Sequence, residues 1–178
     1  MDMTSFFCEK FNTCFDGVTI VTPSKTEEQR ILSRVPEGKK LYKVKYADQM
    51  TKRFSDYLEK NEIKRKKLLF HGSAERNWAS IIQNGLHAGK SGKFGGGIYL
   101  SPEYKMSQMY GKIIGVFDTA YGNPLFIYNY EDVGFNQNIL YVNDKQCVHA
   151  NPKNIKTLCY NEVVFFEPEA VILKYLIL

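Results

Sequence analysis

Three short segments of the chain carry side chains that could do chemistry at a bound ligand. The run LLFHGS, residues 68–73, delivers His71 at its end, and Gly72 then lets the backbone approach a ligand closely. The run FGGGIYLSPEYKMSQMY, residues 94–110, holds Tyr99 and Tyr110 eleven residues apart, a spacing that could bring their rings face to face. Glu162 opens the apolar run VVFF, where a carboxylate loses solvation unless it is paired or used.

Each of these residues also has a plain structural interpretation. A histidine beside a glycine at a strand end is often structural, the two tyrosines could pack in a core, and Glu162 could lie at the wet edge of a strand. Ser107 lies three residues before Tyr110, so its hydroxyl can point into the same gap. The glycines at 95–97 precede a strand-like run instead of opening a helix, which excludes a Rossmann dinucleotide fingerprint.

Together, the three segments resemble a known family. The order of His71 before Gly-Ser, Tyr99 in GGGIYLS and Glu162 in YNEVVFF resembles the His-Tyr-Glu triad of the diphtheria-toxin-like ADP-ribosyltransferases. The likeness is greatest to the poly(ADP-ribose) polymerase catalytic domain, and it extends from about residue 41 to residue 178. This resemblance implies an ADP-ribosyltransferase fold and an NAD-dependent enzyme that transfers ADP-ribose to a protein acceptor, itself included. NAD would be the co-substrate, and no metal is expected.

The resemblance also implies roles at the nicotinamide end of NAD. Glu162 would hold the nicotinamide-ribose 2′-hydroxyl and stabilise the oxocarbenium ion that develops as neutral nicotinamide leaves. Gly72 would pair its backbone with the carboxamide, and the Ser107 hydroxyl would add a third contact. Tyr99 and Tyr110 would sandwich the pyridinium ring, which cation–π attraction and stacking both favour.

At the adenosine end, the resemblance implies that His71 binds the ribose hydroxyl and that Ser73 and Asn77 lie nearby. The expected catalytic residues are therefore His71, Tyr99 and Glu162. The expected NAD-binding residues are His71, Gly72, Ser73, Asn77, Tyr99, Ser107 and Tyr110.

The chain departs from the family in two places. Residues 86–94, LHAGKSGKF, form a short donor loop whose Lys90 and Lys93 could meet the pyrophosphate or stay solvated. Met106 stands where many chain-building members have a lysine. We therefore expect mono-ADP-ribosylation or short chains in preference to long polymer. The alternatives are a non-catalytic module that binds NAD or ADP-ribose and an NAD glycohydrolase.

The elements that must position these residues follow from local patterns. Helices are expected after Ser24, whose spacing to Glu27 is that of a capping box, over 48–60 and 77–84, and from an N-cap at Ser101 to about residue 110. Strands are expected at 18–22, 41–46, 67–71, 97–100, 112–120, 125–128, 138–142, 162–166 and 170–177. Early helices and late strands with hairpin-sized connections indicate an α+β fold. With the resemblance, we expect a mostly antiparallel split β-sheet core with short flanking helices.

Composition predicts one domain, residues 1–178, because 178 residues with 44% hydrophobic content suffice for one core. Residues 1–17 are interpreted as a loose N-terminal arm, and we expect no helical regulatory domain before the fold. Cys8, Cys14, Cys147 and Cys159 have neither metal-site nor disulfide spacing, so free thiols are expected.

The same composition narrows the partners and the compartment. A net charge of +5 permits an anionic ligand, but the basic residues are mostly interspersed with acids. The basic run at 61–67 lacks clustered aromatics, so we do not expect a nucleic-acid partner. We find no signal peptide and no membrane-spanning segment, and we expect an intracellular protein, cytoplasmic or nuclear.

Overall fold

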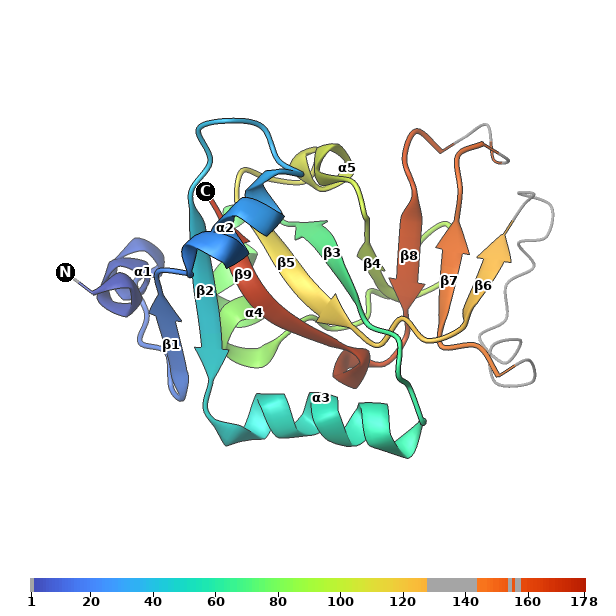
Figure 1. The fold of residues 1–178 in the computed structure, drawn as a ribbon, viewed down its shortest axis with the longest axis horizontal. Helices are drawn as coiled ribbons and strands as arrows, with labels where there is room; N and C mark the ends of the chain where they lie inside the picture. Colours follow the sequence, from blue (N-terminus) through green and yellow to red (C-terminus); the bar gives the residue numbers. More distant parts are fainter. Residues whose placement is uncertain (1, 128–143, 154, 156–157) are drawn as a thin grey trace.

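A computed structural model describes residues 2–127, 144–153, 155 and 158–178. Two β-sheets lie next to each other, with short helices around them (Figure 1). The larger sheet has the strand order β1-β2-β9-β5-β3, and the smaller has the order β4-β8-β7-β6. The strands are β1 Val18–Val21, β2 Leu41–Tyr46, β3 Lys67–Gly72, β4 Ile98–Leu100, β5 Ile114–Thr119, β6 Pro124–Ile127, β7 Cys147–Ala150, β8 Glu162–Phe165 and β9 Val171–Ile177.

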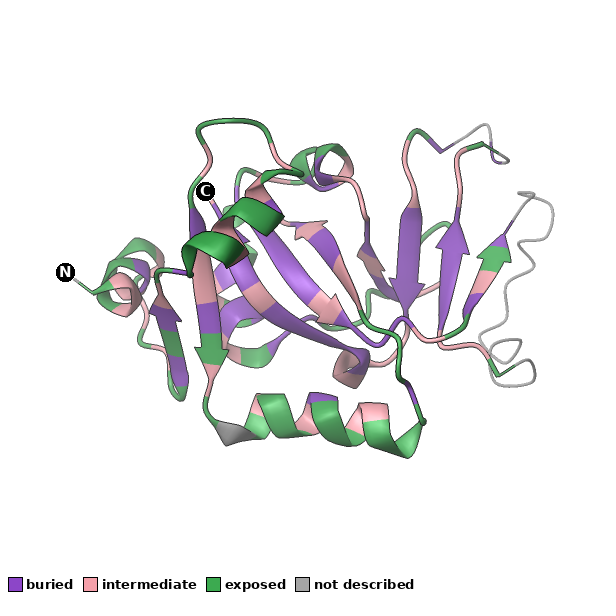
Figure 2. Ribbon diagram, in the orientation of Figure 1, coloured by how far each residue is buried: buried purple, intermediate pink, exposed green. Residues whose placement is uncertain are grey.

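The larger sheet is antiparallel throughout, and its centre is buried. β5 and β9 pair along their length with a bulge at Val116/Phe117, and each of the two lies between two other strands of the sheet. Every residue of β9 except Lys174 is buried, as its nearly continuous apolar sequence predicts. Figure 2 shows this buried centre flanked by helices whose outer sides are exposed.

Three of the helices, α2, α3 and α4, lie where the local sequence patterns predict them. In α2, Lys25–Leu32, Ser24 and Glu27 form both halves of a capping box. The amphipathic helix α3, Asp48–Lys60, buries Phe54 and packs against η3, Pro168–Ala170, and β9. A 3₁₀ turn, η1 Glu75–Asn77, leads into α4, Trp78–Asn84, which ends at Gly85 with a φ of 81°. Helix α5 spans Tyr104–Gln108.

The two sheets meet at β3 and β4, the strands that carry His71 and Tyr99. Phe70 of β3 and Ser101 after β4 form an antiparallel bridge, with both of their N–H groups donating to the other's carbonyl at 2.7 and 2.9 Å. This bridge joins an edge strand of each sheet, β3 and β4. The ends of β3, β4 and β8 are thereby brought to one junction.

The mixed helix-and-strand content confirms the α+β expectation, and eight of the nine expected strands coincide with observed ones. The strand expected at 138–142 lies outside the described residues. β7 was not expected, and it pairs with β6 in parallel, the one parallel pairing among the described strands.

Two local predictions are wrong. Residues 3–11 are not a loose arm but form α1, Met3–Phe11, with Asp2 as its side-chain cap. Phe7 of this helix is fully buried, and its ring packs edge-on against the ring of Tyr42 in β2, with 5.1 Å between the centroids. Tertiary packing therefore stabilises a helix that the local sequence pattern does not predict. The helix expected from Ser101 begins instead at Tyr104, because Ser101 is engaged in the bridge to Phe70.

Candidate active site

β3 and β4 place His71 and Tyr99 against each other. The Nδ1 atom of His71 lies 2.8 Å from the Tyr99 carbonyl oxygen. Because a carbonyl oxygen can only accept, Nδ1 carries the proton and the neutral ring keeps Nε2 as an acceptor. Burial lowers the pKa of His71, against the opposing effect of its hydrogen bond to Tyr99, and so favours this neutral form.

The Tyr99 hydroxyl holds the end of the donor loop, residues 86–94, and the glycine that follows it. It accepts the Phe94 backbone N–H and donates to the Gly95 carbonyl, both at 2.8 Å. Gly92 packs directly on the ring, since a Cβ there would lie 2.3 Å from the Tyr99 hydroxyl oxygen. The tyrosine therefore serves both as a wall of the site and as the anchor of the loop beside it.

Helix α5 packs on the end of β3 through a glycine. A Cβ on Gly72 would lie 1.8 Å from the Ser107 carbonyl oxygen, a separation that only the absence of a side chain permits. Ser107 is itself 3% exposed. Tyr110, two residues after the helix, is 59% exposed, so its ring is not packed in the core.

Glu162 is the first residue of β8, opposite Ala150 of β7. It is 5% exposed, and its Oε2 atom has no hydrogen-bond partner among the described residues. Burial raises the pKa of this carboxyl group, while the positive charge of Lys93 acts in the opposite direction. A buried carboxylate with a free oxygen is costly for folding, which is typical of a group kept for function.

One cleft of about 410 Å³ brings together most of the residues expected from the sequence. Six of the expected residues line it, from β3, β4, α5, the turn after α5 and β8: His71, Gly72, Tyr99, Ser107, Tyr110 and Glu162. Met106 and Tyr160 also line it. The sequence did not single out Tyr160, which lies two residues before Glu162 and outside β8.

The other two expected residues, Ser73 and Asn77, line a neighbouring cavity of about 480 Å³. His71 and Tyr99 line both cavities, so the two hollows share a wall. The Asn77 side-chain amide donates to the Ser73 hydroxyl at 2.9 Å. An elongated ligand could therefore lie across His71 with one end in each cavity.

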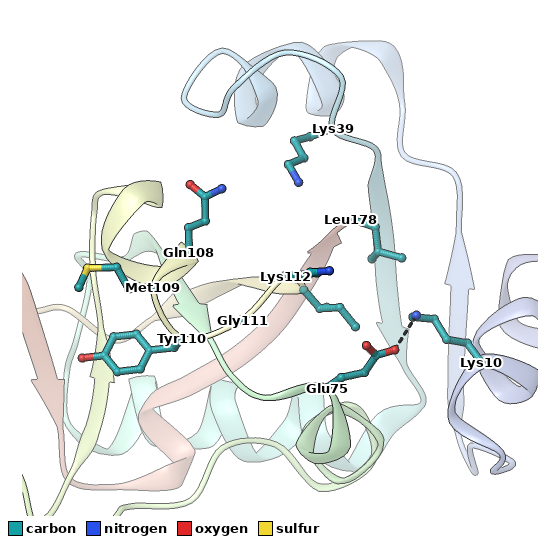
Figure 3. Close-up of a pocket in the computed structure, with 10 residues that line it drawn as sticks. Lys10, Lys39, Glu75, Gln108, Met109, Tyr110, Gly111, Lys112 and Leu178 are labelled. Atoms are coloured by element: carbon teal, nitrogen blue, oxygen red, sulfur yellow. Dashed lines mark hydrogen bonds and ion pairs between the residues drawn. The ribbon is translucent and has the colours of Figure 1, made fainter.

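A third hollow, of about 760 Å³, lies on the other side of Tyr110 (Figure 3). Tyr110 and Met109 line both this hollow and the cleft. Three lysines and one glutamate reach it, and Lys10 pairs with Glu75 at 2.7 Å. The charge balance on this side of the cleft is therefore positive.

In the described part of the chain, no cluster of three or more His, Cys, Asp or Glu side chains could hold a metal ion. All four cysteines are free, and Cys147 is buried, which raises the pKa of its thiol to about 12. No helix among the described residues has the length and apolar character that a bilayer span requires.

Comparison with known proteins was informative at the family level. The family model described as the poly(ADP-ribose) polymerase catalytic domain matches residues 25–115. The matched region contains the β3, β4 and α5 residues of the cleft and ends before Glu162. No curated protein matches the chain significantly.

Proposed function

Since this chain belongs to the poly(ADP-ribose) polymerase catalytic domain family, we propose that it cleaves the nicotinamide–ribose bond of NAD and transfers single ADP-ribose units or short chains to a protein acceptor, itself included. The observation that carries the proposal is Glu162, a buried carboxylate with an unpartnered oxygen at the cleft that Tyr99 and Tyr110 also line. A module that only bound the nucleotide would have no use for that carboxylate.

In this proposal the nicotinamide ring lies between Tyr99 and Tyr110. Two aromatic faces stabilise a cationic pyridinium by stacking and by cation–π attraction. The backbone of Gly72 lies against the backbone of Ser107, and both residues line the cleft. In this proposal the Gly72 backbone and the Ser107 hydroxyl together hold the carboxamide. The adenosine half would extend past His71 toward Ser73 and Asn77.

The neutral tautomer of His71 fits a ribose hydroxyl. With its proton on Nδ1, the ring offers Nε2 as an acceptor for an O–H donor. A hydroxyl bound there would fix the middle of NAD at the wall that the two cavities share. Protonated His71 could not accept this hydrogen bond.

Bond cleavage leaves the electron pair of the C1′–N bond on nicotinamide, which departs as a neutral ring and needs no general acid. The positive charge left on the ribose is the charge that Glu162 would stabilise, through its carboxylate and through a hydrogen bond from the 2′-hydroxyl to Oε2. The acceptor nucleophile then supplies the electron pair of the new bond to C1′ and loses its proton to solvent.

The acceptor side of the cleft supports single units or short chains. Met106 lines the cleft at the place where a lysine stands in many chain-building relatives. A thioether offers no positive charge for the pyrophosphate of a growing chain. We propose that the uncharged side chain of Met106 limits elongation of the chain.

The test is incubation of the purified protein with NAD labelled in its adenylate part, with released nicotinamide measured in parallel. We expect label on protein as a discrete band and an equal amount of nicotinamide. Nicotinamide release without protein label in the presence of candidate acceptors would indicate an NAD glycohydrolase. Bound NAD with neither signal would show a binding module and contradict the proposal.

Tyr110→Ala should weaken NAD binding about 10-fold, because one stacking face of the nicotinamide is lost. The thermal midpoint should stay unchanged, since the ring is 59% exposed and contributes little to the core. Isothermal titration with NAD and a thermal melt measure the two quantities. Unchanged affinity would mean that Tyr110 does not contact the ligand.

The pH dependence of nicotinamide release should show an acid limb. Only ionised Glu162 stabilises the ribosyl cation, and burial raises its pKa, so kcat/KM should fall at a pH above the ordinary glutamate value of 4.5. Protonation of His71, whose pKa is lowered from 6.5, acts in the same direction on NAD binding. Initial rates at low NAD from pH 8 downward test this, and a flat profile to pH 4.5 would contradict it.

A further inference from the structure

We propose that Glu103 is a positioning residue, which fixes the placement of Glu162 by binding the residue immediately before it, Asn161. The inference rests on the proposed function, because it assigns how the reacting carboxylate is held relative to the nicotinamide site. Glu103 itself does not line the cleft.

Both hydrogen bonds that the Glu103 side chain accepts come from Asn161. Its Oε1 atom accepts the Asn161 backbone N–H at 2.9 Å and the Asn161 side-chain amide at 2.7 Å. Hydrogen bonds to a charged acceptor are about twice as strong as neutral ones. The peptide that leads into Glu162 is therefore held at its N–H by a carboxylate.

The carbonyl oxygen and the side-chain oxygen of Asn161 also have hydrogen-bond partners. The Ser101 hydroxyl donates to its carbonyl oxygen at 2.7 Å and accepts the Glu103 backbone N–H at 3.0 Å. The His149 Nε2 atom lies 3.2 Å from its side-chain oxygen. The N–H, the carbonyl and the amide of Asn161 thus all have partners, which leaves the start of β8 little freedom.

The hydrogen bond between His149 and Asn161 continues to a third residue, Tyr121. Because the Asn161 side-chain oxygen only accepts, His149 carries its proton on Nε2, and its Nδ1 accepts the Tyr121 hydroxyl. Burial of His149 lowers its pKa and favours this neutral state. The hydrogen bonds are therefore all donated in one direction: Tyr121 donates to His149, His149 to Asn161, and Asn161 to Glu103.

The Glu103 side chain does not cap the helix that follows it. Glu103 is the N-cap residue of α5, but its side chain makes no capping hydrogen bond. The side chain turns to β8 instead. It therefore links the segment that carries Ser107 and Tyr110 to the segment that carries Glu162.

This link sets the distance between the nicotinamide contacts and the carboxylate. Misplacing a reacting group by about 1 Å can reduce a rate about 100-fold. Loss of Glu103 should therefore reduce kcat more than NAD affinity, because the NAD contacts on β3 and β4 do not depend on it.

The experiment compares Glu103→Ala, Glu103→Gln and the exposed control Glu37→Ala for nicotinamide release and for NAD affinity. We expect Glu103→Ala to lower kcat at least about 10-fold with the NAD Kd changed less than about threefold. Glu103→Gln should stay within about threefold of wild type, because its amide oxygen can accept both bonds. Equal kcat loss in the Ala and Gln variants, or none in the Ala variant, would overturn the proposal.

A double-mutant cycle with Asn161→Ala tests whether Glu103 acts through Asn161. If it does, Glu103→Ala/Asn161→Ala should lose much less than the product of the two single losses. Independent, multiplicative losses would overturn the proposed route.

Amide hydrogen exchange separates this inference from the function. Glu103→Ala should speed exchange at Asn161 at least about 10-fold, whereas Glu37→Ala should not. If wild type released no nicotinamide, the proposed function would fail, and accelerated exchange would still decide whether Glu103 holds this peptide. Unchanged exchange would overturn the positioning role in an active enzyme as well.

Discussion

Glu162→Gln is expected to lose most ADP-ribose transfer and, at the same time, to make the protein more stable. Removing the charge that faces the ribosyl cation should lower kcat about 10²- to 10³-fold, the usual effect of losing one preorganised electrostatic contact. NAD binding should change little, since the charge matters chiefly in the transition state. Nicotinamide release and NAD titration on the purified variant measure the two effects.

The gain in stability follows from the same carboxylate. Glu162 is buried and its Oε2 atom has no partner among the described residues, so its ionisation opposes folding. At pH 7 we expect a rise of about 2–4 °C in the thermal midpoint, equivalent to about 1 kcal/mol in a domain of this size. A variant that is both inactive and less stable would indicate a structural role for Glu162.

The pH dependence of the stability difference is a control. Burial raises the folded-state pKa of Glu162 above its unfolded value near 4.5, so wild-type stability from this group is complete below that value and falls as the pH rises through the folded pKa. The gap between Glu162→Gln and wild type should therefore be absent at pH 4 and open toward pH 7. A gap that stayed constant across this range would have another cause.

Gly72→Ala should have the second large effect, on binding and folding together. A methyl group there would lie 1.8 Å from the Ser107 carbonyl oxygen and 2.7 Å from its carbonyl carbon. Both are backbone atoms, so no side-chain rotation relieves the contact, and α5 must move away from β3. We expect a loss of about 3 kcal/mol in the free energy of unfolding, at the upper end for overpacking.

The same movement should abolish measurable NAD binding, because it separates the Gly72 backbone from the Ser107 hydroxyl. Urea denaturation and NAD titration provide the measurements. Gly89→Ala is the matched control for stability, since a methyl group there would meet its nearest atom at an ordinary 3.5 Å. A stable Gly72→Ala protein that still bound NAD would show that β3 and α5 can separate without cost to the site.

Local sequence determined much of the frame. Patterns within a few residues account for the capping box at Ser24, the amphipathic helix Asp48–Lys60, the strand that carries His71 and the strand that begins at Glu162. These features depend on hydrogen bonds and side-chain periodicity that neighbours in sequence supply. The order of His71, Tyr99 and Glu162 was likewise sufficient to indicate the family, which the match over residues 25–115 confirms.

Tertiary structure decided what no local pattern carries. The helix Met3–Phe11 depends on Phe7 packing against Tyr42, and Ser101 leaves its expected helix because it bridges to Phe70. The burial of Glu162 comes from strand neighbours distant in sequence, and the contact of Glu103 with Asn161 spans 58 residues. Burial and hydrogen bonding between distant segments depend on the assembled sheets. The sequence was therefore sufficient to identify the candidate reacting groups. Their protonation, their spacing and the contacts that hold them in place depend on the fold.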